Sequence, residues 1–214
     1  MSAEQELAHI AAEISACTLC KLHKTATHAV PGEGPANAKI MFIGEAPGFN
    51  EDRQGRPFVG AAGQFLNELL GLAGLQRSDV FIGNIVKHRP PNNRDPEADE
   101  LAACVPYLDR QIAAINPRVI VTLGRFSMSK WFPNERISRI HGQPRWLDGR
   151  MYVPMLHPAA ALHQPQNRPL IEDDFRRLPE FLAEAERRMA SAAPPEPKPA
   201  ARRDDPDLEQ LTMF

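Results

Sequence analysis

The sequence predicts an α/β fold, a three-layer α/β/α domain built on a central, mostly parallel four-stranded sheet. Two observations lead to this prediction. Short apolar runs of strand length alternate with segments in which apolar residues recur at helical spacing, which is the pattern of a parallel sheet covered by helices. In addition, 214 residues with 43% hydrophobic content are enough for one packed domain with a short appendage.

The first element is a helix over 4–15, because Leu7, Ile10 and Ile14 lie on one face at helical spacing. The four predicted strands are buried apolar runs. They cover 38–44, 79–86, 118–124 and 151–156.

The remaining helices lie between and after these strands. Gly74 ends a helix over 61–74, and Asp95 is the predicted N-cap of a helix that has Pro96 in its first turn and runs to about Ile115. A short helix follows the third strand. A helix over 173–188 ends the domain.

The first strand leads into a Gly-rich stretch, "GEAPGFNEDRQGRPFVGAAG" (44–63), which is predicted to be a loop suited to tight turns and close approach of a ligand. It lacks both G-x-G-x-x-G and a Walker lysine, which argues against dinucleotide binding and a P-loop. Phe58 lies in this stretch without helical periodicity, so its ring is a candidate for contact with a ligand.

Chemically useful residues follow the predicted strands. Glu45, Asn84, Gly124 and His157 each lie at or just after a strand end. Because ligands of parallel sheets bind beyond the carboxyl ends of the strands, these residues are expected to converge on one crevice.

Charge and termini limit the class of protein. The 25 basic and 27 acidic residues include three basic and five acidic residues from position 190 onward, so the body is balanced and DNA contact would need a local basic patch. The sequence has no basic, apolar leader and no apolar run of membrane length, which predicts a cytoplasmic protein without membrane association. Three cysteines do not make a disulfide framework and indicate metal or redox use.

Three ordered motifs resemble those of the family 4 uracil-DNA glycosylases, the iron–sulfur branch of their superfamily. They are "GEAPG" followed by "ED" and "G-x-PFVG-x-AG", then "NIVK-x-RPPNNRDP", and finally "HPAA" followed by "LH". The resemblance extends from about residue 10 to about 185. It implies a uracil-DNA glycosylase domain over 1–189 that acts as a monomer on single- or double-stranded DNA, cleaves the N-glycosidic bond of uracil and leaves an abasic site for base excision repair.

A cysteine pair, Cys17 and Cys20, raises the question of a metal site, because a tetrahedral site takes four ligands and the chain has one further cysteine, Cys104. In the family that the sequence resembles, four cysteines hold a [4Fe–4S] cluster, and the third lies where this chain has His88. The resemblance therefore implies a structural [4Fe–4S] cluster on these four residues. By residue type alone the set fits zinc about as well, and His88 has the alternative of contacting phosphate beside Arg89.

The resemblance also assigns roles in uracil recognition. Phe58 is expected to stack on a uracil that has been flipped out of the DNA. The Asn84 carboxamide can pair with O4 and N3 of uracil and would mismatch cytosine. Gly44 and Ala46, which flank Glu45, are expected to line the same pocket.

Catalysis is expected to depend on charge stabilisation. His157 is predicted to donate a hydrogen bond to uracil O2, where negative charge grows. Glu45 or Glu51 is expected to orient the attacking water and to oppose the positive charge on the sugar. One of the two, preferably Glu51, would instead exclude the methyl group of thymine.

The predicted DNA contacts lie in the loops after the second and fourth strands. Leu162 or His163 is expected to fill the gap left by the flipped base, and the basic residues are expected to contact phosphates. The full set is Lys87, Arg89, Arg94, Leu162, His163 and Arg168.

The chain ends in a tail of different composition. Residues 190–209 are rich in Pro and Ala and are predicted to be an unfolded linker. The last five residues, "QLTMF", resemble the peptide by which bacterial repair proteins bind the sliding clamp. The predicted clamp contacts are Gln210, Leu211, Met213 and Phe214.

Two other functions compete with this interpretation. One is a non-catalytic or covalently trapping uracil-DNA binder, since that branch shares the "VKH" of this chain but carries a basic insert that is absent here. The other is a zinc-structured module that binds nucleotides.

Overall fold

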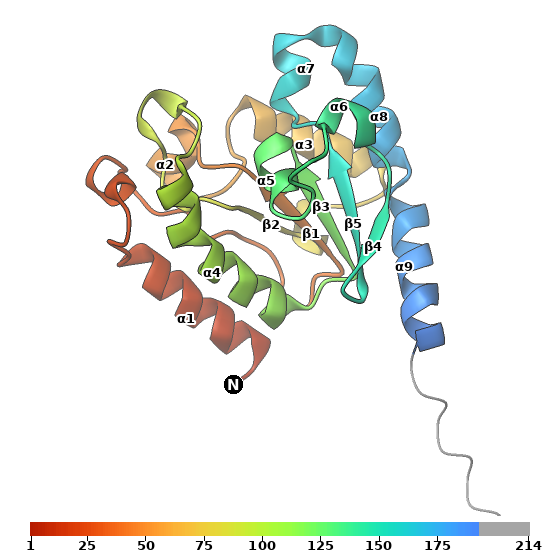
Figure 1. Ribbon diagram of the computed structural model, residues 1–214, viewed down its shortest axis with the longest axis horizontal. Coiled ribbons are helices and arrows are strands. Elements are labelled where there is room, and N and C mark those ends of the chain that lie inside the picture. The colour runs from red at the N-terminus through yellow and green to blue at the C-terminus, as the bar shows by residue number, and fades with distance from the viewer. Residues whose placement is uncertain (193–214) are drawn as a thin grey trace, which may run out of the picture.

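The computed structural model describes residues 1–192, in which a five-stranded sheet is flanked by helices on both faces (Figure 1). The strand order is β2-β1-β3-β5-β4. The strands are β1 (Ile40–Gly44), β2 (Phe81–Asn84), β3 (Val119–Leu123), β4 (Arg145–Leu147) and β5 (Arg150–Met155). This confirms the predicted fold class, with one strand more than expected.

The four predicted strands form the parallel part of the sheet. β1 runs parallel to β2 and to β3, and β3 runs parallel to β5. Their carboxyl ends therefore lie at one edge of the sheet, where Gly44 is paired directly with Asn84. This edge is where a ligand site is expected.

The fifth strand, β4, is antiparallel to β5 and was missed in the sequence. It has three residues, all exposed or half-buried, so it gives no apolar run. The two turn residues, Asp148 (φ 49°) and Gly149 (φ 75°), both have the left-handed conformation that a two-residue hairpin requires. The "DG" pair was thus the available signal for this hairpin.

The helices form the two outer layers. They are α1 (Ala3–Ser15), α2 (Phe49–Gln54), α3 (Ala61–Leu72), α4 (Ala98–Ile115), α5 (Arg125–Ser129), α6 (Ile137–Ile140), α7 (Ala159–His163), α8 (Arg168–Arg176) and α9 (Leu178–Ala192). Short 3-10 turns cover Lys21–Lys24, Arg77–Asp79, Pro91–Asn93 and Pro165–Asn167.

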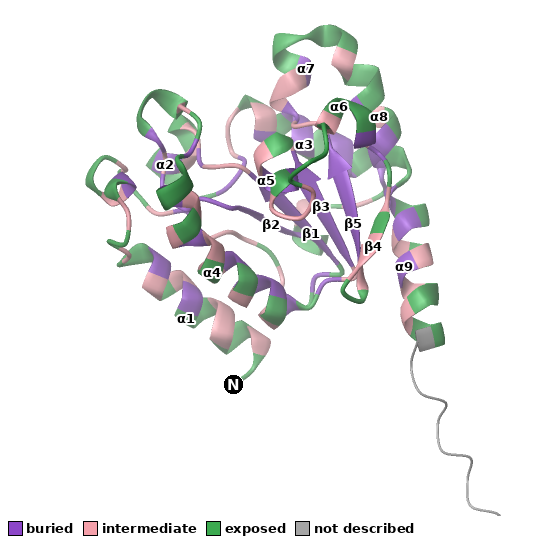
Figure 2. Cartoon of the chain, viewed as in Figure 1, coloured by how far each residue is buried: buried purple, intermediate pink, exposed green. Residues whose placement is uncertain are grey.

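The core consists of two apolar layers, one on each face of the sheet, and the strands are buried throughout their parallel part (Figure 2). Alternate residues of each strand point to opposite faces. Phe42 and Val121 pack with α3, α8 and α9, whereas Met41, Ile120 and Tyr152 pack with α4. α1 lies along α4 and completes the second layer (Figure 1).

Two helix predictions need correction. α4 begins at Ala98 with Glu97 as its N-cap, and the predicted cap, Asp95, instead forms an ion pair with Arg125. The single helix predicted over 173–188 is two helices, α8 and α9, because Pro179 lacks a backbone N–H and fits the first turn of a new helix.

Two boundaries also differ from the prediction. The stretch predicted as a loop over 44–63 contains the helix α2, which ends at Gly55 in the left-handed conformation (φ 67°). α9 continues to Ala192, so the predicted linker does not begin at residue 190. The rest of the linker and the QLTMF peptide lie outside the described residues.

No helix within the described part of the chain combines the length and the apolar character needed to cross a membrane.

Candidate active site

A cavity of about 590 Å³ opens at the carboxyl edge of the parallel strands. It collects residues from the ends of β1, β2 and β5 and from the loops that follow them. The lining residues are Glu45, Ala46, Pro47, Gly48, Glu51, Phe58, Ala62, Asn84, Pro90, Asn93, Arg94, Asp95, His157, Ala159 and His163.

Most of the residues predicted for uracil recognition and catalysis thus surround one cavity. Gly44 and Gly124 pack directly against residues that line the cavity, where a larger side chain would clash. A Cβ atom on Gly44 would lie 2.3 Å from Asn84 Oδ1 and 2.7 Å from the Phe58 ring. A Cβ atom on Gly124, which has φ of 90°, would lie 3.3 Å from His157 Cβ.

The Phe58 ring is held in place by an unusual backbone conformation. Phe58 has φ of 51°, which is costly for a large side chain. Arg77 stabilises this turn, because its guanidinium donates to the carbonyl oxygens of Phe58 (3.1 Å) and Pro57 while its Nε donates to Glu33 (2.7 Å). The Phe58 and His157 rings are stacked, with centroids 5.6 Å apart.

Asn84 presents an acceptor that the protein does not use. The residue is 2% exposed, and its Oδ1 is buried without a hydrogen-bond partner among the described residues. An unpaired buried acceptor costs about 1–3 kcal/mol. Because Asn84 lines the cavity, turning its carboxamide from Gly44 toward the cavity would let this oxygen accept from a ligand.

The protonation state of His157 follows from its surroundings. Burial lowers the pKa of His157 to about 4, so the ring is neutral near pH 7. Its Nδ1 accepts a hydrogen bond from the Ala159 N–H (3.1 Å). The remaining proton therefore lies on Nε2, which makes His157 a neutral donor in the cavity.

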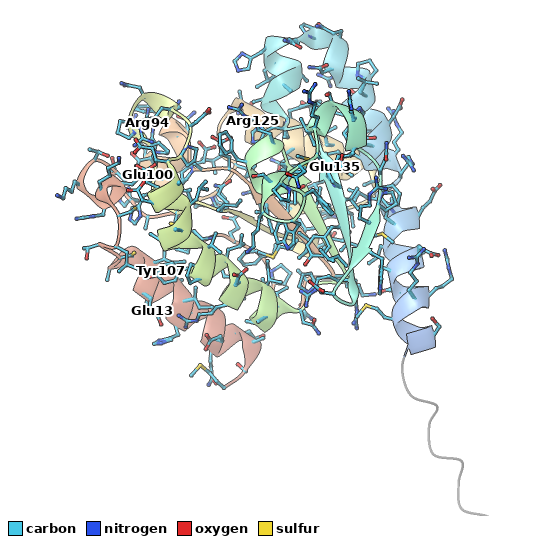
Figure 3. The ribbon with its side chains drawn as sticks, in the orientation of Figure 1. Glu13, Arg94, Glu100, Tyr107, Arg125 and Glu135 are labelled. Carbon is cyan, nitrogen blue, oxygen red and sulfur yellow. The ribbon has the colours of Figure 1, made fainter. Side chains whose placement is uncertain are left out.

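The pKa of Glu45 is raised, whereas that of His157 is lowered. Burial, together with the Asp95 carboxylate, raises the pKa of Glu45 to about 7, and Arg125 opposes this shift. Arg125 is itself paired with Asp95 at 2.5 Å and lies at the start of α5 (Figure 3). A carboxylate with this pKa can accept a proton near neutral pH.

Glu51 is fixed by the backbone. Its Oε1 accepts hydrogen bonds from the N–H groups of Val59 and Gly60, each at 2.8 Å. These contacts join α2 to the start of α3 beside Phe58. The side chain lines the cavity, but one of its oxygens is committed to this turn.

The prediction that Lys87 contacts phosphate is wrong. Its side chain is 1% exposed, and its ammonium donates to the Asn84 carbonyl (2.7 Å) and to Gln111 Oε1 (2.8 Å). A third, longer contact of 3.5 Å reaches the Pro31 carbonyl. Lys87 therefore supports the backbone under Asn84 from inside the protein.

Two other predicted phosphate contacts are paired within the protein. Arg94 lines the cavity, but its guanidinium binds the buried carboxylate of Glu100 at 2.6 and 2.9 Å at the start of α4 (Figure 3). Arg168 bridges Glu172 (2.8 Å) and Glu68 (2.9 Å), which ties α8 to α3. Neither guanidinium is free to turn to DNA without giving up these contacts.

The other predicted DNA contacts lie near the cavity mouth. Arg89 is hydrogen-bonded through Nε to Asn93 Oδ1 at 2.7 Å and has no carboxylate partner within residues 1–192. His163 lines the cavity, and Leu162, its neighbour in α7, is 50% exposed.

The three cysteines lie close to one another where α1 meets α4. The pKa of Tyr107 is raised to about 12, chiefly by its hydrogen bond with the Cys17 side chain, and Tyr107 lies on α4 near α1 (Figure 3). Burial raises the pKa of the Cys104 thiol, and the charges of Cys20 and Cys17 add to this effect. None of the three cysteines forms a disulfide.

His88 is buried beside this region, and burial lowers its pKa, so its imidazole is neutral and able to bind a metal. His23, whose Nδ1 lies 2.6 Å from the Cys20 carbonyl, is close enough to lower the pKa of His88 further. Burial removes the alternative in which His88 contacts phosphate. The donor types suit iron or zinc, although residues 1–192 contain no group of three or more His, Cys, Asp or Glu side chains arranged as a metal site.

Several contributors to the site were missed in the sequence. Arg77 and Arg125 act through ion pairs with residues distant in the chain, which no local pattern indicates. The sequence indicates Asp95 only as a helix cap. Asn93 and Pro90 lie within the NIVK-x-RPPNNRDP motif, which is the signal that points to their loop.

Comparisons with known proteins identify the family of the chain. Residues 31–184 match the Uracil DNA glycosylase superfamily. The chain is 50% identical over 186 residues to a type-4 uracil-DNA glycosylase of Saccharolobus solfataricus, with 81% of this chain and 85% of the relative covered. A type-4 uracil-DNA glycosylase of Archaeoglobus fulgidus is 47% identical, with 83% and 94% covered. A type-5 uracil-DNA glycosylase of Pyrobaculum aerophilum is 32% identical, with 77% and 76% covered.

Proposed function

Because this chain belongs to the type-4 uracil-DNA glycosylases of the uracil DNA glycosylase superfamily, we propose that the cavity at the carboxyl edge of its sheet receives a uracil flipped out of DNA. The chain is a uracil-DNA glycosylase, so the reaction is hydrolysis of the bond between uracil N1 and the sugar C1′.

The unpaired Oδ1 of Asn84 is the observation that carries this assignment. Uracil N3–H would donate to this oxygen, and the Asn84 amide N–H would donate to uracil O4. Cytosine presents the reverse pattern and would leave both contacts unmade. Phe58 supplies the stacking face, and Arg77 keeps its backbone in the required turn.

His157 is proposed to stabilise the leaving group. As the N1–C1′ bond breaks, its electron pair stays with uracil and negative charge grows on O2. A neutral Nε2–H is a suitable donor to that oxygen, and a well-placed donor of this kind contributes about 10²–10³ in rate. The hydrogen bond from Ala159 to Nδ1 supports this tautomer.

Glu45 is proposed as the residue that positions water. The oxygen of the water bonds to C1′ on the face opposite the departing uracil, and Glu45 accepts the released proton. Its carboxylate also opposes the positive charge that develops on the sugar. The backbone contacts of Glu51 support a different role, which is to fix the wall beside Phe58 and to exclude the methyl group of thymine.

Uracil release from single-stranded and duplex oligonucleotides tests these assignments. The wild type is expected to release free uracil over many turnovers, and Asn84→Ala is expected to lose most of this activity while keeping its fold. Full activity in Asn84→Ala would overturn the pocket assignment. An SDS-stable complex with DNA and little free uracil would instead favour a covalently trapping binder.

For the cysteines we propose a [4Fe–4S] cluster held by Cys17, Cys20, Cys104 and His88. The closeness of the three thiols and the neutral, buried imidazole support this set. When bound, the cluster would serve as a structural cross-link between α1, the loop after β2, and α4. Brown protein that contains iron and acid-labile sulfide is expected, with iron kept in His88→Cys and lost in His88→Ala. Colourless protein with one zinc ion would contradict the proposal.

For the C-terminal peptide we propose docking on the bacterial sliding clamp, on the strength of its sequence alone. Deletion of 210–214 is expected to abolish co-purification with the clamp and to leave uracil release from short duplexes unchanged. Undiminished co-purification would refute this proposal.

A further inference from the structure

An exposed aromatic ring with two guanidinium groups over it lies next to the cavity. Phe49, at the start of α2, is 51% exposed. The guanidinium carbon of Arg89 lies 5.1 Å from its ring centroid, and that of Arg53 lies 5.6 Å away. We call these three residues the Phe49 platform.

The Phe49 platform borders the mouth of the cavity. Pro47 and Gly48, which directly precede Phe49, line the cavity, as does Pro90, which directly follows Arg89. A strand of DNA whose uracil enters the cavity must therefore pass close to the platform with its neighbouring nucleotides.

The helix that carries Phe49 and Arg53, α2, is anchored on its inner side. The buried Asp52 carboxylate accepts hydrogen bonds from the N–H groups of Thr27 (2.8 Å) and His28 (3.3 Å). Glu51 binds the turn before α3. With these side chains directed inward, Phe49 belongs to neither apolar core cluster of the described residues.

The platform also carries positive charge that the protein does not neutralise. Most arginines near the cavity are paired, as Arg94 is with Glu100 and Arg125 with Asp95. In contrast, neither Arg53 nor Arg89 has a carboxylate partner within 4.0 Å in the part of the chain that the structure describes. An exposed ring with free guanidinium groups has the two features of single-strand binding surfaces, a face for base stacking and cations for phosphate.

We propose that Arg53 and Arg89 turn from the Phe49 ring to the phosphates that flank the flipped uracil, and that the uncovered ring stacks on an adjacent base of the same DNA strand. This inference rests on the proposed function, because it assumes that uracil occupies the cavity. Stacking on a ring does not depend on base identity, so the platform would hold DNA of any sequence beside the damage. It would also compensate for the phosphate contact that the buried Lys87 does not offer.

An abasic-spacer scan tests the stacking directly. Single-stranded oligonucleotides with one uracil carry an abasic spacer at one of the two positions on either side of it, and kcat/KM for uracil release is measured. One spacer position is expected to lower the wild-type value about tenfold. Phe49→Ala is expected to lose about the same factor on the intact oligonucleotide and to lose no more with that spacer. Phe49→Trp is expected to restore the wild-type pattern.

Leu72→Ala is the matched control, because Leu72 is similarly exposed, at 43%, on α3 outside the cavity lining. It is expected to behave as the wild type. Wild-type kcat/KM in Phe49→Ala on every oligonucleotide would overturn the platform. The platform would also be overturned if, at every spacer position, the spacer and Phe49→Ala lowered kcat/KM by factors that multiply. Independent effects of this kind would mean that Phe49 does not contact the removed base.

The charge component is tested by salt. Arg53→Ala and Arg89→Ala are each expected to reduce the slope of log K against log salt concentration by about 0.7 on single strands. The control is Arg187→Ala, on α9, which pairs with Glu184 and is expected to keep the wild-type slope. An unchanged slope in both platform variants would contradict the phosphate contacts.

Failure of the proposed function would give a different result in the uracil-release assay from failure of the platform. If the wild type released no uracil, the cavity assignment would fall. The platform would then be tested by binding alone. Phe49→Trp adds a tryptophan at the platform, and single-stranded DNA that stacks on it is expected to quench its fluorescence. Quenching equal to that of the wild type's own tryptophans would overturn the platform.

Discussion

At Glu45, a single carboxyl group is expected to set the pH dependence of the reaction. Its pKa of about 7 means that the carboxylate form is lost as the pH falls below that value. Uracil release is therefore expected to rise with pH through about 7 in the wild type and to be low and nearly flat in Glu45→Gln. A profile of kcat from pH 5 to 9 checks this, and an unchanged profile in Glu45→Gln would show that another group titrates.

The same shift predicts a change in stability. Because the folded pKa of Glu45 lies above its unfolded value of 4.5, this group stabilises the fold fully below pH 4.5, and the contribution is lost as the pH rises through about 7. Glu45→Gln removes the cost of a buried charge above pH 7. We expect it to be more stable than the wild type at pH 8.5 by roughly 1–2 kcal/mol after allowance for solvent screening, and similar at pH 4.5. Urea unfolding at the two pH values measures the difference.

His157 offers a second test at the scale of one residue. His157→Ala removes the Nε2–H donor and is expected to lower kcat by about 10²–10³, with the fold retained by circular dichroism. His9→Ala is the control, because His9 is an exposed residue of α1 that pairs with Glu13. A loss of less than tenfold in His157→Ala would show that charge on uracil O2 is stabilised elsewhere.

Lys87 shows why some residues could not be assigned from the sequence. A lysine beside "RPP" in a DNA-binding protein is ordinarily expected to contact phosphate. Its burial follows from the packing of Gln111 and Pro31 around it, and those residues are distant in the chain. By contrast, Asn84 and His157 were placed correctly at the cavity, because a side chain that follows a parallel strand has only one edge of the sheet to occupy.

Lys87→Met is expected to destabilise the protein by about 2–3 kcal/mol, since the carbonyl of Asn84 and the amide of Gln111 lose a buried donor. Lys39→Met is the control, because Lys39 is exposed and pairs with Glu186 at the surface. Denaturant midpoints compare the two variants. Equal stability of Lys87→Met and the wild type would mean that water replaces the ammonium.

Among the elements, α3 contains two glycines with opposite expected responses. A Cβ atom on Gly63 would lie 1.9 Å from the Phe58 carbonyl oxygen, whereas one on Gly71 would meet nothing within 4 Å. Gly63→Ala is expected to cost about 3 kcal/mol and to lower activity by displacing Phe58. Gly71→Ala is expected to gain about 0.5–1 kcal/mol at unchanged activity. Thermal unfolding and uracil release of both variants check this pair, and a neutral Gly63→Ala would show that the Phe58 turn yields readily.

The elements that the sequence predicted are those with strong periodic signals. Each parallel strand is an apolar run buried on both faces, so it can be predicted from its own sequence without knowledge of its neighbours. α2 and β4 are short and partly polar, and each exists because neighbouring segments bind it. α2, for example, is anchored through Asp52 to the backbone of Thr27 and His28, which no local pattern of α2 indicates.

At the scale of the whole molecule, α1 is held to the domain by two kinds of contact. Arg110 of α4 pairs with Glu6 (2.9 Å) and Glu13 (2.6 Å) of α1, and the proposed cluster would add a tether at the Cys17 end. In Cys104→Ala we therefore expect loss of iron and early proteolytic cleavage between residues 15 and 21, with the rest of the domain intact. Cleavage at the same rate as in the wild type would argue against a cluster that joins α1 to α4.

The balanced charge of the body gives the molecule no overall attraction to DNA, so affinity must come from local groups. The balance can be counted in the sequence, but the local groups cannot be identified from it. Four basic residues were assigned to phosphate from their positions in motifs, and Lys87, Arg94 and Arg168 are committed to partners within the protein. Pairing within the folded protein decides which cations remain without a carboxylate partner.

The order of the strands has a consequence for synthesis on the ribosome. Glu45 and Asn84 are made early, whereas His157 follows β5, which can join the sheet only beside β3. A nascent chain that has emerged only through α5 would hold the carboxylate and the amide but no imidazole. The proposed catalytic set is therefore complete only after β5 and His157 have left the exit tunnel and β5 has joined the sheet.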